Sequence, residues 1–229
     1  MIRPGFLRFF VLATTLLAAA EIVGQSYSAR RQVSQEQWPS LSDLAASDRD
    51  WLRVSDLKLS EHQSAEISRI AIPWMRTHCG RLSAEERRTQ VFALSSERIQ
   101  LNVAGPMQIV VEEAGDWESD SRSCSCAPSL NCHRWLLNLS GDDGKVLLEY
   151  SGIGLLPLNS RGHGYRDIVT GYNAQLGRLE LTIWRFDGSR YLAFRCATKS
   201  YDRRAINSEY SDQEIDKTGT ISEHSCTSR

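Results

Sequence analysis

The chain has 229 residues, which is enough for one sizeable domain with flanking segments and too few for two large domains. Its 27 Lys and Arg residues nearly balance its 28 Asp and Glu residues, and no basic cluster is interleaved with aromatic residues. The charge pattern therefore lacks the electrostatic footprint of a nucleic-acid-binding protein and excludes that class of partner.

The first 20 residues have the three parts of a secretory signal peptide. Arg3 and Arg8 give a basic start, residues 9–20 are uncharged and mostly apolar, and the alanines at 18–20 provide small residues for cleavage. The apolar run is shorter than the about 20 residues that a membrane-spanning helix needs. We therefore predict cleavage near Ala20, a mature chain without a membrane span, and a periplasmic or secreted location.

A polar segment and then a helical segment follow the predicted signal peptide. Residues 21–41 have no sustained apolar period, which predicts a flexible lead-in, and residues 42–90 are predicted to form a short helical segment. Within it, Ser60-Glu-His-Gln63 has the form of a capping box and predicts a helix start. Pro73 disfavours the helical conformation of the residue before it, so we expect the helix to end or kink there.

Residues 91–196 change character to strands. Short apolar runs with a period of two are separated by turn residues, and Asp187-Gly188 predicts a type I′ hairpin turn with positive φ at both residues. The predicted fold class is mostly β (α+β): an antiparallel meander, sandwich or partial barrel with a small N-terminal helical segment. Residues 197–229 have few apolar side chains and predict a polar tail, mostly disordered unless Cys226 ties it down.

Two segments of the predicted β domain have similar sequences. Residues 101–111 and 158–170 each contain an apolar residue followed by Asn, then a glycine turn, then a strand with Ile-Val. In this feature the chain resembles the FG-GAP type of β repeat, in which an Asp/Asn/Gly turn precedes such a strand in exported propeller proteins. In that family the turn is acidic and often binds calcium, whereas here the first turn has no acidic residue and the second has only Asn159 and Asp167. The resemblance implies an exported β domain and no more.

Six cysteines, an even number in a chain with an export signal, predict disulfide bonds. Cys126 and Cys132 enclose a turn-rich loop of five residues, and we predict that these two form a disulfide. Cys196 would then pair with one of three remaining candidates: Cys79, Cys124 or Cys226.

The same cysteine-rich loop offers an alternative, a metal-holding protein. Cys124, Cys126, Cys132 and His133 are residue types that hold zinc or copper(I). Structural zinc sites, however, usually combine one close pair of ligands with a second, distant pair, and here all the candidates lie in one short loop. We therefore favour disulfides over a metal centre.

A second alternative is an exported hydrolase. His163 and Asp167 lie close together in a glycine-containing turn, and a histidine general base needs a carboxylate partner of this kind. No nucleophile elbow, HExxH zinc motif or phosphate-binding loop accompanies them. We expect no cofactor, and we favour a non-catalytic protein over an enzyme.

Trp184 is the predicted partner-binding residue. It interrupts the apolar face formed by Leu179, Leu181 and Ile183, so its side chain should project from the opposite face. An exposed tryptophan is a candidate binding anchor. The leading hypothesis is an exported, non-catalytic domain that binds a protein, glycan or envelope component.

Overall fold

The structure, a computed structural model, describes residues 38–47, 51–78, 83–85, 94–112, 131–140, 144–175, 177–201 and 219–226. The chain divides into two compact units, Met1–Gln32 and Val33–Arg229, and every described residue belongs to the second unit. The predicted signal peptide and most of the predicted lead-in lie outside the described residues. Within the described ranges, no helix is long and apolar enough to cross a membrane.

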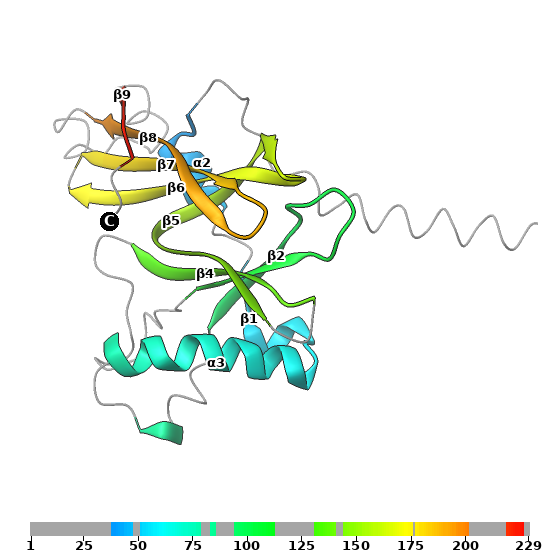
Figure 1. Ribbon diagram of the computed structural model, residues 1–229. Coiled ribbons are helices and arrows are strands. Elements are labelled where there is room, and N and C mark those ends of the chain that lie inside the picture. The colour runs from blue at the N-terminus through cyan, green and yellow to red at the C-terminus, as the bar shows by residue number, and fades with distance from the viewer. Residues whose placement is uncertain are drawn as a thin grey trace, which may run out of the picture. The chain divides into compact units, whose positions relative to one another are not determined.

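The described strands form one antiparallel sheet in which each strand pairs with the next along the chain (Figure 1), which confirms the prediction of a mostly β meander with a small helical part. The strands are β1 Leu52–Arg53, β2 Ser95–Ile99, β3 Gln108–Glu112, β4 Cys132–Asn138, β5 Lys145–Gly162, β6 Tyr165–Gln175, β7 Arg178–Phe186, β8 Tyr191–Ser200 and β9 Thr220–His224. The helices are α2 Leu41–Ala46, the 3₁₀ helix η1 Val54–Leu57 and α3 Glu61–His78.

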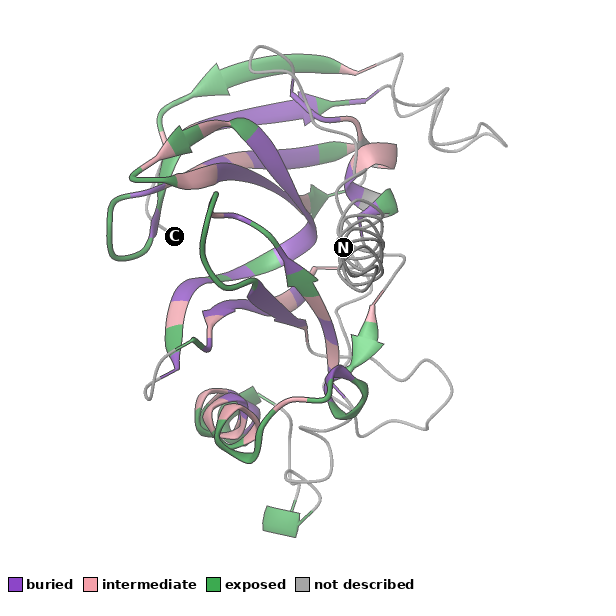
Figure 2. Ribbon diagram, turned by 90° about the vertical axis from the view of Figure 1, so that its right-hand side faces the viewer, coloured by how far each residue is buried: buried purple, intermediate pink, exposed green. Residues whose placement is uncertain are grey.

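The long strand β5 divides the sheet into two half-sheets. Its residues up to Gly152 pair with β4, and its residues from Ile153 onward pair with β6. The first half-sheet therefore contains β1 to β4 and the start of β5, and the second contains the rest of β5 and β6 to β9. Figure 2 shows buried residues along strands of both half-sheets.

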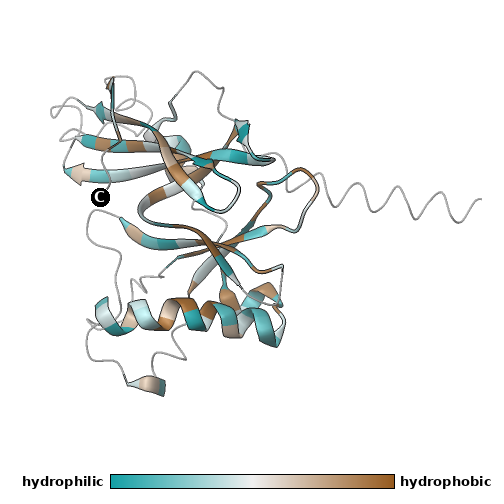
Figure 3. Ribbon diagram, viewed as in Figure 1, coloured by the Kyte–Doolittle hydropathy of each residue, from teal (hydrophilic) through white to brown (hydrophobic). Residues whose placement is uncertain are grey.

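The helix α3 covers one face of the first half-sheet. Ile67, Ala71 and Met75 recur at helical spacing, are buried, and form a core cluster with Trp135 and Leu137 of β4. Figure 3 shows that hydrophobic and hydrophilic residues alternate along α3, as expected for a helix with one buried side. The first apolar core thus lies between α3 and the first half-sheet.

The short helix α2 covers the second half-sheet. Leu44 is fully buried in a second core cluster that includes Ile153. The Ser47 hydroxyl donates to the Leu44 carbonyl (2.7 Å) and accepts from the Leu155 amide (3.2 Å), which fixes the end of α2 to β5. Gly154 has a φ of 62°, and a Cβ at this position would lie 2.7 Å from the Leu44 carbonyl oxygen, so only glycine fits beneath α2.

A third core cluster joins the two half-sheets. It contains Leu136 and Tyr150 from the first half-sheet and Ile168 and Phe186 from the second. Leu136 alternates along β4 with residues that contact α3, so the third cluster lies on the opposite face of the strand. Both faces of the meander are therefore covered over much of its length.

The two segments of similar sequence are neighbours in space. Asn102 forms an antiparallel bridge with Tyr165, and the Arg166 amide donates to the Leu101 carbonyl (2.7 Å). These contacts attach the chain that follows β2 to the start of β6, outside the order of the meander.

The start of α3 was predicted correctly and its end was not. The Gln63 amide donates to Ser60 Oγ, and the Ser60 amide donates to Gln63 Oε1, both at 3.1 Å, which is the predicted capping box. The helix continues through Pro73 to His78. An end at Pro73 is therefore wrong, because the fully buried Met75 beyond it anchors the last turn to the first core and this packing outweighs the lost hydrogen bond.

The type I′ turn lies in a different hairpin from the predicted one. Phe186 pairs with Tyr191, so β7 and β8 are joined by four residues, and Asp187 Oδ1 accepts from the amides of Ser189 (2.7 Å) and Arg190 (2.8 Å). These amide donors lower the pKa of Asp187 and close the wider loop, so the type I′ prediction is wrong here. The two-residue turn with positive φ is residues 163–164, between β5 and β6.

Some of the described residues in the predicted polar tail form strands. β8 continues beyond Cys196 to Ser200, and β9 pairs with it. A disulfide joins Cys196 to Cys226, which was the condition under which we expected order in the tail. The sheet also begins before residue 91, because β1 lies within the predicted helical segment.

Candidate functional site

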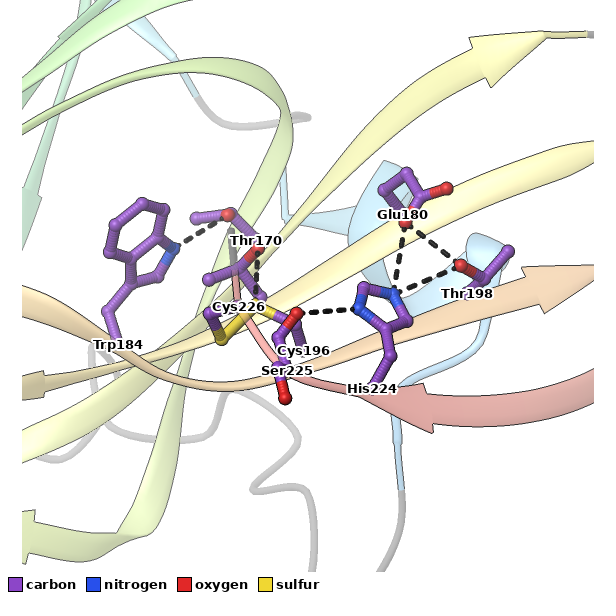
Figure 4. The surroundings of a disulfide bond; sticks show 9 residues. Thr170, Glu180, Trp184, Cys196, Thr198, His224, Ser225 and Cys226 are labelled. Carbon is purple, nitrogen blue, oxygen red and sulfur yellow. Dashed lines mark hydrogen bonds and ion pairs between the residues drawn. A yellow bond between two sulfur atoms is a disulfide. The ribbon is translucent and has the colours of Figure 1, made fainter. Parts of the chain in front are cut away.

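A row of polar side chains crosses the second half-sheet on the face opposite α2 (Figure 4). Along β7, Leu179, Leu181 and Ile183 belong to the second core, so the residues that alternate with them project from the other face. The register places matching residues of β6, β8 and β9 beside them. We call this set the polar strip, and its members are Thr170, Glu180, Thr182, Trp184, Thr198 and His224.

Trp184 forms one end of the polar strip. As predicted, it projects from the face opposite Leu181, and its ring is half-buried against the third core. The indole Nε1 donates to Thr170 Oγ1 at 2.9 Å, which fixes the orientation of the ring. The result is an aromatic surface that is held rigidly and remains partly open.

Glu180 and His224 form the other end of the polar strip. Glu180 is only 9% exposed, and its Oε1 accepts from Arg178 Nε at 2.8 Å. Its Oε2 accepts from Thr198 Oγ1 at 3.0 Å and lies 3.4 Å from His224 Nε2. The Thr198 hydroxyl is also 3.2 Å from His224 Nε2, so carboxylate, hydroxyl and imidazole meet at one point.

The two ring nitrogens of His224 have different neighbours. Nδ1 lies 3.0 Å from the Ser225 carbonyl oxygen, which can only accept, so Nδ1 carries hydrogen. Nε2 faces two oxygens: Glu180 Oε2, which can only accept, and Thr198 Oγ1, whose hydrogen goes to Glu180. A nucleophilic triad requires the carboxylate at the nitrogen remote from the hydroxyl, whereas Glu180 and Thr198 share Nε2.

The disulfide lies beside this polar cluster. Cys196 is the register partner of both Thr182 and His224, and its sulfur is 3.8 Å from Thr182 Oγ1. Cys226 follows His224 by two residues, so the bond fastens the strand that carries the imidazole. Figure 4 shows the disulfide between Trp184 and His224.

The polar strip is unusual because several of its polar side chains are buried, whereas buried positions on a sheet face are normally apolar. Thr170, Glu180 and Thr198 are 4%, 9% and 8% exposed, and burying a carboxylate is costly even when it is paired. Apolar residues of similar size would pack at this place without that cost. Local conflicts of this kind are typical of functional sites, so we take the polar strip as the candidate site.

The structure does not assemble His163 and Asp167 into a catalytic pair. His163 is exposed at the tip of the β5–β6 turn, with a φ of 47°. Asp167 is fully buried and accepts from Arg185 through Nε (3.2 Å) and Nη2 (2.7 Å). The Arg185 guanidinium also lies 3.6 Å from the ring centre of Phe194. Among the described residues no hydrogen bond joins His163 to Asp167.

The predicted metal loop is described only at its end. Cys132 is disulfide-bonded, so it offers no thiolate to a metal, and Cys124 and Cys126 lie outside the described residues. Because Cys196 pairs with Cys226, the partner of Cys132 is one of the cysteines beyond the described ranges, and the predicted Cys126–Cys132 bond stays a prediction.

His133 is held by aromatic rings. It stacks on Trp74 at 4.3 Å between ring centres, and its Nε2 is 3.0 Å from Glu149 Oε1. Burial lowers the pKa of His133 more than Glu149 raises it. In the part of the chain that the structure describes, no three His, Cys, Asp or Glu residues are grouped to hold a metal ion.

Trp184 is a candidate from the sequence, whereas the other residues of the polar strip were not predicted. The alternation along β7 that placed Trp184 also places Glu180 and Thr182 on the same face, so that signal was available. His224 could not be found in this way, because it lies 44 residues from Glu180 in a segment without an apolar pattern.

Comparison with known proteins gives no further assignment. No family model matches the chain, and neither a curated protein nor a solved structure matches it. The polar strip is therefore the feature of the described residues from which a function is inferred.

Proposed function

We propose that the chain is an exported, non-catalytic domain that binds a polyhydroxylated ligand, a segment of a glycan, on the polar strip. One observation carries the proposal: the half-buried indole of Trp184 lies on the same sheet face as a cluster formed by the buried Glu180 carboxylate, the buried Thr198 hydroxyl and the exposed His224 imidazole. Binding sites commonly combine an aromatic surface with a few fixed polar groups. Sugars match this combination, because they present C–H faces to a ring and hydroxyls to donors and acceptors.

The groups of the polar strip suit hydroxyls in particular. Glu180 accepts, the Thr182 hydroxyl can both donate and accept, and the Thr198 hydroxyl, whose hydrogen goes to Glu180, can accept. Arg178 already balances the charge of Glu180, so a neutral ligand fits the strip better than a strongly cationic one. Trp184 supplies the apolar contact area, which is the usual source of binding energy for an anchoring aromatic residue.

Binding rather than hydrolysis is the function that these residues support. Most glycoside hydrolases use two carboxylates, about 5 to 10 Å apart, as acid and as base or nucleophile. The polar strip contains a single carboxylate, that of Glu180, and Arg178, Thr198 and His224 all contact it.

The location is part of the proposal. The basic start, apolar run and alanines of residues 1–20 support cleavage near Ala20 and a periplasmic or secreted mature chain. The Cys196–Cys226 bond supports an oxidising compartment, because disulfides rarely persist in the cytosol.

The test is a glycan array probed with labelled mature protein, followed by calorimetric titration of each glycan that binds. Trp184→Ala and Glu180→Gln should each weaken binding at least tenfold. Phe194→Ala, which removes an exposed aromatic ring of β8 that stacks with Arg185 outside the polar strip, should leave binding unchanged. Thermal unfolding of each variant separates lost contacts from lost folding.

Two results would contradict the proposal. The first is no binding of oligosaccharides by folded protein, and the second is equal affinity in the Trp184→Ala variant and the wild type. Capture of a protein component alone, insensitive to Glu180→Gln, would assign the function to another surface.

A further inference from the structure

The strand β9 contributes nothing to the apolar cores. All five residues of Thr220–His224 are exposed, and none belongs to any of the three core clusters. Burial of apolar surface is what normally keeps a strand in its sheet. An element without it has low local stability and opens before the rest of the fold unless something else retains it.

The non-covalent contacts of β9 are polar and mostly exposed. Its backbone pairs with β8 from Ser200↔Thr220 to Cys196↔His224. Glu223 Oε1 accepts from Trp38 Nε1 at 3.0 Å and pairs with Arg195, whose side chain is 39% exposed. Exposed ion pairs contribute little to stability, so these contacts alone hold the strand weakly.

The covalent contact is the Cys196–Cys226 disulfide, which closes a loop of 30 residues. It keeps the end of β9 close to β8 and so reduces the entropy that the segment would gain on leaving. The bond lies where β9 ends, next to His224, which is the one residue that β9 gives to the polar strip.

We propose that the Cys196–Cys226 disulfide is a redox-controlled tether for β9, and that its reduction releases the strand and withdraws His224 from the polar strip. Release of the strand is independent of any ligand, whereas control of binding depends on the proposed glycan function. In the reduced state Glu180 and Thr198 lose their imidazole partner, and the edge of β8 loses its pairing strand.

The chemistry requires a dithiol as the reductant. Its thiolate attacks the sulfur of Cys226, which is half-exposed near the chain end, whereas Cys196 is 8% exposed. The S–S bond breaks, a mixed disulfide forms, and Cys196 leaves as a thiolate that takes a proton. The second thiol of the reductant then displaces Cys226, so the protein gains two electrons and two protons and the reductant becomes a disulfide.

The experiment follows hydrogen exchange of the mature protein through a graded series of dithiothreitol concentrations. Alkylation and mass spectrometry report the fraction of reduced Cys196 and Cys226 in the same samples. Amides of β9 should lose protection at least tenfold in step with alkylation, while amides of β6 and β7 keep theirs. Full protection of β9 after both cysteines are alkylated would overturn the proposal.

Variants separate this bond from other disulfides that dithiothreitol also reduces. The Cys196→Ala/Cys226→Ala double variant should show unprotected β9 without reductant, and His224→Ala, which keeps the disulfide, should show protected β9. Protected β9 in the double variant would refute the tether. If the double variant unfolds globally, partial reduction of the wild type decides instead.

Glycan titration of the same samples distinguishes the two proposals. Oxidised wild-type protein that binds no glycan refutes the proposed function and leaves the tether standing. Protein that binds equally well in the oxidised state and with β9 released refutes control of the site, while the proposed function stands.

Discussion

The ion pair between Asp167 and Arg185 gives the sharpest prediction about stability. Asp167 is fully buried, and Arg185, with a side chain that is 38% exposed, approaches both of its carboxylate oxygens at 2.7 to 3.2 Å. The hydrogen bond with Asp167 raises the pKa of Arg185 although burial opposes this. Arg185→Met keeps an unbranched apolar stem and leaves the carboxylate buried without its cation.

The expected cost follows from these contacts. Removing one partner of a buried pair costs about 3 to 5 kcal/mol, and the partial exposure of Arg185 favours the lower value. Loss of the guanidinium stacked on Phe194 adds about 0.5 to 1 kcal/mol. We therefore expect Arg185→Met to lower the free energy of unfolding by about 3 to 4 kcal/mol, measured by urea titration of far-UV circular dichroism.

Two further variants test whether the cost comes from the unpaired Asp167 carboxylate. Asp167→Asn combined with Arg185→Met removes the buried charge, so the double variant should regain at least about 1 kcal/mol relative to Arg185→Met alone. Arg190→Met, an exposed change in the same hairpin, should cost less than about 0.5 kcal/mol. A cost below about 1 kcal/mol for Arg185→Met, or no recovery in the double variant, would show that Asp167 does not depend on Arg185.

Two further predictions concern β5 and His133. Gly154→Ala should lower the free energy of unfolding by about 1 to 3 kcal/mol in urea titrations, because it combines a φ of 62° with a contact to Leu44. Gly164→Ala, with a φ of 84° and open space around it, should cost less, and equal costs would exclude the contact as a cause. Burial lowers the pKa of His133, so the unfolded chain binds more protons below about pH 6.5 and stability should fall as the pH drops from 7 to 5. Melting temperatures of His133→Gln should fall less over that range, and an unchanged pH dependence would contradict this.

The features that the sequence predicts well are local. The capping box of Ser60 and Gln63 involves residues three apart, and the alternation of Leu179, Leu181 and Ile183 lies within one strand. In these cases the residues that determine the structure are close in sequence, so no knowledge of distant packing is needed. The overall class, a mostly β meander, follows from repeated patterns of this kind.

The features that the sequence does not predict depend on distant partners. α3 passes Pro73 because residues beyond it reach a core built from β4, about 60 positions further on. The loop at Asp187 has four residues because the Asp187 carboxylate accepts hydrogen bonds from two backbone amides. An Asp-Gly pair in the sequence is compatible both with this loop and with a two-residue turn. β9 has no apolar pattern by which it could be predicted. Backbone pairing with β8 and a disulfide, instead of apolar burial, hold it in the sheet.

The strand β5 also determines how the protein can fold. Its 18 residues belong to both half-sheets, so neither half has a complete set of strands without it. Each strand pairs with its neighbour in the chain, so no strand pairing needs a crossover connection, which favours faster folding than a sheet with crossovers. A fragment that ends within β5 would expose an unpaired edge and half of an apolar core, so the domain should unfold as a single cooperative unit.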